Sequence, residues 1–181
     1  MMNNRLILTA AAALLLAACG GKKDQPAAAP EAQAPAAQAA SYTKKATYFR
    51  LPGAAGGEVD LASYAGKPVL VMFFTETCPY CRKAAPFIQK VAAAYGPKGL
   101  STVGICVQDS AQAARNFASD FGVTFPLAYK GKEVSRNYKT QGVPYIYLLT
   151  ADHEIYDVWE GYDPQYDGPI TKAVETLLAK K

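Results

Sequence analysis

Six apolar residues in this chain run without interruption towards a pair of cysteines, which is followed by a segment with helical spacing. The run Val69–Phe74 is rich in β-branched and aromatic side chains, which indicates a buried strand. After Cys78 and Cys81, apolar residues recur at helical intervals as far as Tyr95. The sequence therefore predicts a buried strand that leads directly into a helix, with both cysteines at the junction.

The junction gives the two cysteines different chemical roles. Cys78 is expected at the N-cap of the helix, with Pro79 at its first position and Cys81 at its third. The first turn offers free N–H groups and a partial positive charge, and both favour the thiolate form of Cys78. A thiolate is the species that attacks disulfides, and Cys81 is near enough to resolve a mixed disulfide formed at Cys78.

A zinc site is the alternative interpretation of two cysteines at this spacing. Zinc needs two further ligands, and the chain offers only Cys106 and the single histidine, His153, at no recognisable spacing. We therefore predict no metal and no cofactor other than a redox-active disulfide between Cys78 and Cys81.

Length and charge limit the number of domains and the kind of partner. The chain has 181 residues, of which 50% are hydrophobic, enough for one domain with a real core. Its formal charge of +4 is mildly basic, and no cluster of lysine and arginine alternates with aromatic residues. Nucleic acid is therefore not an expected partner, and the domain is expected to be a monomer.

The first 42 residues have the composition of targeting and tethering segments. Residues 1–18 have the pattern of a signal peptide, and they end in Leu-Ala-Ala before Cys19, which resembles a bacterial lipobox. We expect lipidation of Cys19, an Ala/Pro-rich linker over residues 19–42 and a folded domain over residues 43–181. The domain would face the periplasm, and Gly20 favours the outer membrane by analogy with enteric sorting rules.

The remaining pattern alternates strands with helices, which predicts an α/β fold with a mixed sheet. Ser110 is the expected N-cap of the second helix, and Pro86 is expected to kink the first. Strands are predicted at 46–51, 58–61, 69–74, 100–107, 125–128, 145–149 and 155–159, and helices at 79–95, 111–121, 132–138 and 167–179.

Several motifs together resemble the TlpA/ResA-like thiol-disulfide oxidoreductases of the thioredoxin superfamily. They are Gly66-Lys67-Pro68-Val69-Leu70-Val71, the two cysteines, Pro86, Phe121-Gly122-Val123 and Gly142-Val143-Pro144. The resemblance implies a thioredoxin fold, a mixed central sheet flanked by helices, with an N-terminal strand extension and an inserted strand–helix unit. It also implies a cis bond between Val143 and Pro144 that faces the cysteines, with a backbone that pairs with a polypeptide substrate.

The chain departs from this family in the acids around its cysteines. Thr77 stands where tryptophan is usual, and Met72 replaces the buried acid of thioredoxin. An acid after the following strand often lies under the active site in this branch, and Asp109 matches it. A partly buried Asp109 could relay a proton to or from Cys81, although it could equally be a local helix cap. Glu76 is expected to face solvent.

Four other positions carry narrower expectations. The pair Pro79-Tyr80 between the cysteines is more typical of glutaredoxins and some Dsb proteins. Tyr145 could form an aromatic wall of the substrate groove or be an ordinary strand residue. Cys106 is expected to be a small buried hydrophobe. His153 falls in a predicted hairpin turn and is expected to be solvated.

These features favour a membrane-tethered thiol-disulfide oxidoreductase that reduces protein disulfides. The resemblance implies recharging by a membrane thiol reductant of the DsbD or CcdA kind, and clients such as oxidised periplasmic proteins or apocytochrome c. The same cysteines working in reverse would make a dithiol oxidase or isomerase of Dsb type.

Two other chemistries fit the sequence less well. A peroxiredoxin-like peroxidase would need proline where Val71 stands, although Thr75 is correctly placed three residues before Cys78. A copper chaperone of Sco type would need a wider cysteine spacing and a suitable distal histidine.

Overall fold

The computed structural model describes residues 42–180, so the predicted signal peptide, Cys19 and nearly all of the predicted linker lie outside the described residues. No helix in this part is long and apolar enough to cross a membrane. The strands are β1 (Arg50–Pro52), β2 (Glu58–Asp60), β3 (Val69–Phe74), β4 (Ser101–Cys106), β5 (Leu127–Ala128), β6 (Tyr145–Leu149) and β7 (Ile155–Glu160). The α-helices are α2 (Pro79–Tyr95), α3 (Ala111–Phe121), α4 (Lys132–Asn137) and α5 (Asp167–Leu178), with 3-10 turns at Leu61–Tyr64, Gly96–Lys98 and Pro164–Tyr166.

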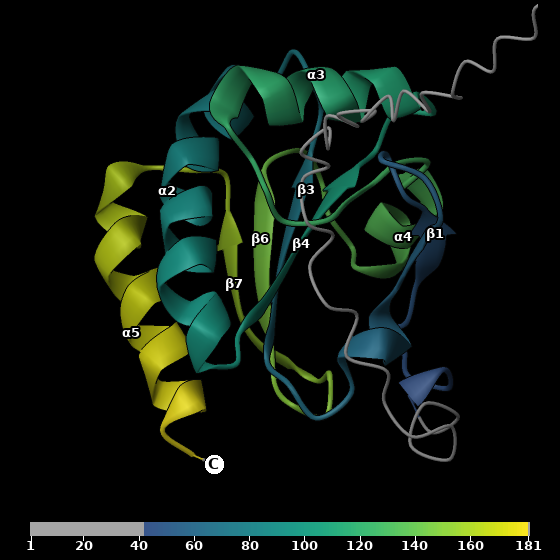
Figure 1. Ribbon diagram of the computed structural model, residues 1–181. Coiled ribbons are helices and arrows are strands. Elements are labelled where there is room, and N and C mark those ends of the chain that lie inside the picture. The colour runs from purple at the N-terminus through teal and green to yellow at the C-terminus, as the bar shows by residue number, and fades with distance from the viewer. Residues whose placement is uncertain (1–41, 181) are drawn as a thin grey trace, which may run out of the picture. The chain divides into compact units, whose positions relative to one another are not determined.

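Five strands form one mixed sheet in the order β5-β4-β3-β6-β7 (Figure 1). The central strand β3 pairs in parallel with β4 and antiparallel with β6. All six of its residues are buried, because helices or loops cover both faces of the sheet at its centre. The uninterrupted apolar run of the sequence therefore corresponds to the most deeply buried strand.

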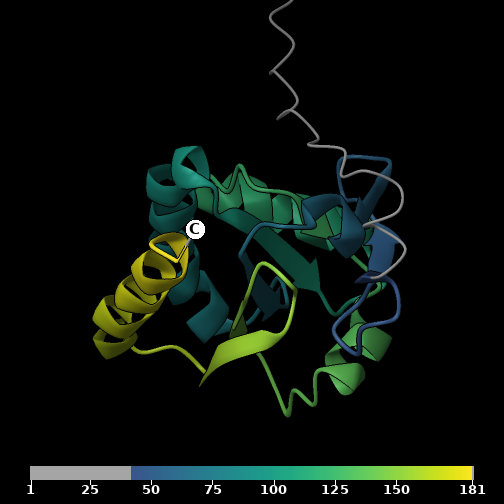
Figure 2. The same cartoon turned by 90° about the horizontal axis from the view of Figure 1, so that it is seen from below.

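The side chains of the sheet divide between two cores, one on each face. One core joins the sheet to α2, α3 and α5, and includes Phe74, Ile88 and Phe117. The other joins it to the β1–β2 hairpin and α4, and includes Phe73 and Tyr138. Figure 2 shows α5 and α4 on opposite sides of the sheet. This three-layer arrangement is the predicted thioredoxin fold, with β1 and β2 as the N-terminal extension and β4–α3 as the inserted unit.

Most predicted elements are present, and the largest differences are at short strands. Residues 46–49 were predicted as strand, but they form a turn and an extended segment in which the Tyr48 amide donates to Lys45 O (3.0 Å). Residues 125–128 shrink to the two-residue β5, since Pro126 has no N–H to give to a sheet. Helix α2 continues through Pro86, whose exposed position leaves the unpaired Arg82 carbonyl open to water.

The sheet has two chemically different ends. The C-terminal end of β3 leads to Cys78 and the start of α2. At the other end, the Tyr42 hydroxyl donates to Ala151 O (3.0 Å) in the β6–β7 turn and accepts from the Gly66 amide (3.2 Å) before β3. A six-residue strand spans about 20 Å, so the chain enters the domain at the end remote from the cysteines.

Candidate active site

Cys78 is the N-cap of α2, as the sequence predicted. Its backbone is extended (φ −69°, ψ 116°), and its Sγ accepts a hydrogen bond from the Cys81 amide at 3.2 Å. Pro79 occupies the first turn, where a missing N–H costs nothing. The Cys78 side chain is half-buried, which leaves its sulfur within reach of a substrate at the surface.

Cys81 lies three residues further along and is fully buried. Burial raises the pKa of the Cys81 thiol, and the hydrogen bond with Cys78 and the proximity of that group raise it further. Both cysteines are free thiols in this structure. The pair therefore consists of an accessible sulfur at a helix N-terminus and a protonated, shielded sulfur beside it.

The bond between Val143 and Pro144 is cis, which confirms the prediction made from the resemblance. The Cys78 thiol donates to Val143 O at 3.4 Å, so this segment lies directly against Cys78. Pro144 is buried and Val143 is half-buried. A partly accessible backbone therefore lies next to the Cys78 sulfur.

The structure changes the interpretation of both nearby acids. Asp109 is exposed, so the expectation of a partly buried carboxylate there is wrong, and its part in proton transfer stays a prediction. Glu76 was expected to face solvent, but it is half-buried because its carboxylate accepts from Asn116 Nδ2 of α3 (2.6 Å). Among the groups acting on the Cys81 thiol, no carboxylate is found.

Sequence reasoning missed two amides that hold the loop before Cys78. Gln108 Oε1 accepts from the Glu76 amide at 2.8 Å, and Asn116 binds the Glu76 side chain from the other side. Gln108 Oε1 also lies 3.7 Å from the Cys106 sulfur, which donates to it. No sequence signal beyond the position of Gln108 after a predicted strand marks these residues.

Two other predictions are resolved by burial. Cys106 is fully buried, as predicted, and burial raises the pKa of its thiol. Tyr145 is 7% exposed and stacks on Tyr147, with 6.1 Å between ring centroids. Of its two interpretations, the ordinary strand residue is therefore the one that the structure supports.

The prediction of a solvated His153 is wrong, because the side chain is 0% exposed. Its Nε2 lies 3.1 Å from Tyr64 O, and its ring packs on Tyr42 with centroids 4.5 Å apart. The Nδ1 atom is buried without a hydrogen-bond partner. Burial lowers the pKa of His153, since protonation would place a charge and an unpaired N–H in the interior.

Within residues 42–180, no three side chains of His, Cys, Asp or Glu come together in a way that could hold a metal ion. The site therefore consists of the dithiol, the cis peptide and the loop held by Gln108 and Asn116. A reduced Cys-x-x-Cys pair at a helix N-terminus, with a cis-proline against it in this sheet topology, defines a thioredoxin-like protein.

Comparisons with known proteins agree with this class. Residues 42–158 match the AhpC/TSA family, and the chain belongs to that family. It is similar to thiol-disulfide oxidoreductase ResA from Bacillus anthracis, with 25% identity over 132 residues, covering 71% of this chain and 76% of the relative. It is also similar to the thioredoxin-like protein YneN from Bacillus subtilis (strain 168), with 28% identity over 121 residues, covering 65% and 71%.

Solved structures give the same result. The thiol:disulfide interchange protein DsbE from Chlorobium tepidum has a TM-score of 0.69 and 25% identity, covering 74% of this chain and 95% of that one. Peroxiredoxin Q from Xanthomonas campestris shares the fold at 17% identity, with a TM-score of 0.63 and coverage of 72% and 91%. With the relatives named above, the site identifies the chain as a thiol-disulfide oxidoreductase of the ResA/DsbE type.

Proposed function

We propose that this protein is a membrane-tethered enzyme that reduces polypeptide disulfides outside the cytoplasm, with Cys78 as nucleophile and Cys81 as resolving thiol. The observation that carries the proposal is the asymmetry of the pair. Cys78 is accessible and accepts from a helix N-terminal amide at 3.2 Å, whereas Cys81 is buried behind it with a raised pKa.

The reaction proceeds by two exchanges. The Cys78 thiolate attacks a substrate disulfide, forms a mixed disulfide and releases one substrate thiolate, which takes up a proton. Cys81 then loses its proton and attacks the Cys78 sulfur, and the second substrate thiolate leaves and is protonated. The substrate gains two electrons and two protons, and the enzyme is left with a Cys78–Cys81 disulfide.

The backbone next to Pro144 would hold the substrate during these steps. Val143 O lies 3.4 Å from the Cys78 sulfur and accepts a hydrogen bond from it while the thiol is protonated. When Cys78 is ionised or joined to a substrate, that carbonyl becomes free to accept from a substrate N–H. Substrate pairing at Val143 is therefore coupled to the chemical state of the nucleophile.

Similarity to relatives named thiol-disulfide oxidoreductase ResA supports the reducing direction. The raised pKa of Cys81 fits its role as the resolving thiol, which stays protonated until the mixed disulfide has formed. Recharging would come from a membrane thiol reductant of the DsbD or CcdA kind. Lipidation of Cys19 would hold the enzyme at the membrane, with oxidised extracytoplasmic proteins or apocytochrome c as clients.

A redox titration with mixed-disulfide trapping tests the proposal. We expect a reduction potential below about −200 mV, and a Cys81→Ser variant that accumulates mixed disulfides through Cys78. A potential near about −120 mV, the range of DsbA, would overturn the reducing direction. Failure of Cys81→Ser to form any mixed disulfide would overturn the roles given to the two sulfurs.

A further inference from the structure

One face of α2 carries accessible side chains that lead away from the active site. Tyr80, Lys83, Phe87 and Lys90 follow one another at intervals of three or four residues, so they share one face of the helix. Tyr80, Lys83 and Lys90 are exposed and Phe87 is half-buried. We call these four residues the α2 stripe. The stripe begins next to Cys78 and continues for three turns.

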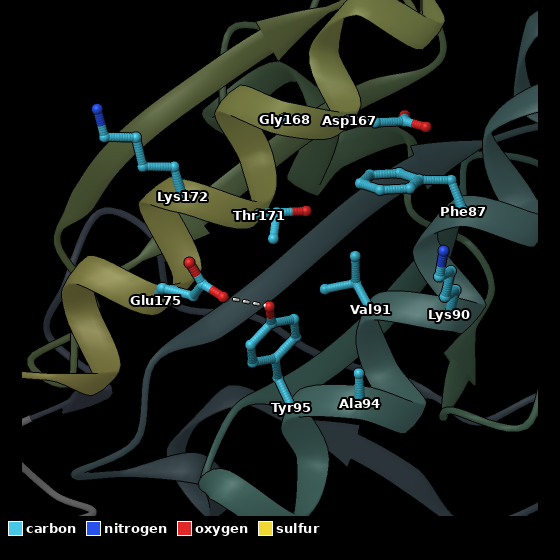
Figure 3. A pocket seen from close by; sticks show the side chains of 10 residues that line it. All are labelled: Phe87, Lys90, Val91, Ala94, Tyr95, Asp167, Gly168, Thr171, Lys172 and Glu175. Atoms are coloured by element: carbon cyan, nitrogen blue, oxygen red, sulfur yellow. Dashed lines mark hydrogen bonds between the residues drawn. The ribbon is translucent and has the colours of Figure 1, made fainter.

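The stripe leads into a hollow of about 420 Å³ between α2 and α5. Phe87 and Val91 of α2 and Thr171 of α5 point into it, whereas Lys172 points away (Figure 3). At the end farther from Cys78, the Tyr95 hydroxyl donates to Glu175 Oε1 (2.7 Å) and bridges the two helices. The hollow is therefore bridged at its far end and is continuous with the α2 stripe at Phe87.

The start of the stripe is aromatic and cationic. Tyr80 is 57% exposed, the highest value for a large hydrophobic side chain among the described residues. Lys83 Nζ lies 5.3 Å from the Tyr80 ring centroid, and the Arg82 guanidinium lies 5.3 Å from that of Phe121. Neither cation forms an ion pair within residues 42–180, so both are available to an acidic partner.

The hollow itself does not favour one sign of charge. Lys90 and Asp167 both line it, and Asp167 already accepts a hydrogen bond from the Tyr162 hydroxyl (2.8 Å). Its apolar lining residues are Phe87, Val91 and Ala94. An uncharged, apolar side chain is therefore the best occupant of the hollow.

We propose that the α2 stripe and its hollow form a binding surface for the disulfide substrate, which would be a polypeptide with an acidic residue beside its cysteine and an apolar residue further along. Seven residue steps along the helix lead from Lys83 to Lys90, which lines the hollow, and this rise is about 10 Å. Three residues of extended chain cover this distance. The acidic side chain therefore contacts Lys83, and an apolar side chain about three residues later enters the hollow. This inference rests on the proposed function.

Three synthetic peptides with the same internal disulfide loop test the surface. Each carries identical tails on both sides of the loop. In the first the tail has Glu next to the cysteine and Leu three residues on, in the second Lys replaces Glu, and in the third Ser replaces Leu. The full-length protein is mixed with each peptide in the presence of a small dithiol that re-reduces the Cys78–Cys81 disulfide, and kcat and KM for peptide disulfide reduction are measured above the rate of the dithiol alone. We expect kcat/KM for the Glu–Leu peptide to exceed that of the other two about three- to tenfold, through KM.

Two surface substitutions and one matched control separate binding from folding. Lys83→Glu should abolish or invert the preference for Glu over Lys, while Lys132→Glu, the same charge change on α4, should leave it intact. Ala94→Trp should fill the hollow and remove the preference for Leu over Ser without changing the preference for Glu. Circular dichroism checks that each variant is folded.

The outcomes are distinct. Equal kcat/KM for the three peptides, or preferences that persist in Lys83→Glu and Ala94→Trp, would overturn the binding surface while the reductase proposal stands. Failure to reduce any peptide would overturn the proposed function and this inference with it. A loss of preference that appears equally in Lys132→Glu would show general charge attraction and would also overturn the surface.

Discussion

The C-terminal end of β3 and the β6–β7 turn lie at opposite ends of one sheet, and each places a titratable side chain just beyond a buried strand. At the first end, Cys78 is half-buried, and its sulfur accepts from the Cys81 amide and donates to Val143 O beside the Cys81 thiol. At the second, His153 is fully buried, with its carbonyl bonded by Thr47 Oγ1 (2.6 Å) and its ring covered by Tyr42.

What separates the two ends is a cover supplied by a distant part of the chain. Residues 42–47 close the hairpin end, and Lys45 adds an ion pair with Glu154. In the described part of the chain, no comparable segment covers Cys78. A titratable group is left accessible at one end and is enclosed at the other, although each follows a strand of the same sheet.

We call the end at Cys78 the open end and the β6–β7 end at His153 the covered end. Replacement of Cys78 should have the largest effect and should change activity without changing stability. Cys78→Ser removes the nucleophile, and we expect disulfide reduction to fall about a thousandfold or more. The side chain is half-buried and nearly isosteric, so the melting temperature should change by less than about 2 °C. Insulin reduction and thermal unfolding measure both quantities. Activity within tenfold of the unmodified protein would contradict the role of Cys78.

Replacement of His153 at the covered end should lower stability and leave activity unchanged. His153→Ala removes a buried ring and its contact with Tyr64 O, and it places alanine at a φ of +59°. We expect a loss of about 2–3 kcal/mol in the free energy of unfolding, measured with urea, and unchanged kcat/KM for the folded protein. The exposed neighbour Asp152→Ala is the control, with a change below about 0.5 kcal/mol. Equal losses for both variants would contradict the comparison.

Acidic pH should lower the free energy of unfolding through His153, by less than the His153→Ala substitution does. The pKa of His153 is lowered on folding, so its stabilising effect is complete above the unfolded value of about 6.5. That effect is lost as the pH falls below 6.5 towards the folded pKa, because the unfolded chain binds the proton first. Urea unfolding between pH 7.5 and 5.5 should show this fall, and His153→Ala should lack it. The same pH dependence in both proteins would assign it to other groups.

The smallest effect is expected at the point where the chain enters the domain. Tyr42→Phe keeps the ring against His153 but removes the hydroxyl that bonds Ala151 O and the Gly66 amide. We expect a loss of about 1 kcal/mol in the free energy of unfolding and no change in activity. Tyr156→Phe, at an exposed aromatic on β7, is the matched control and should have no effect. A loss of activity in Tyr42→Phe would show that the two ends are coupled.

Local sequence signals predicted the open end well. The apolar run of β3, the N-cap position of Cys78 and the helical spacing of α2 all depend on residues close together in the chain. The buried Cys106 followed from its apolar strand. The cis bond at Pro144 did not follow from any local pattern, and it was predicted only from the family resemblance.

The covered end was not predictable in this way. The turn Ala151-Asp152-His153-Glu154 is polar, and His153 is buried by residues 42–47 and by the backbone at Tyr64, all about ninety or more positions earlier in the chain. Glu76 was misjudged for a similar reason, because Asn116, forty residues later, holds its carboxylate. The hydrophobicity pattern around a residue does not show which distant residues will pack against it.

The positions of Tyr42 and of the end of α5 also decide how the domain can be handled. Tyr42 enters beside the β6–β7 turn, and Glu175 meets Tyr95 where α2 finishes, so α5 also ends on the side away from Cys78 (Figure 1). A resin, an electrode or a fused neighbour joined directly at Tyr42 or at the end of α5 would leave the Cys78 sulfur facing the bulk solution, about one strand length from the support.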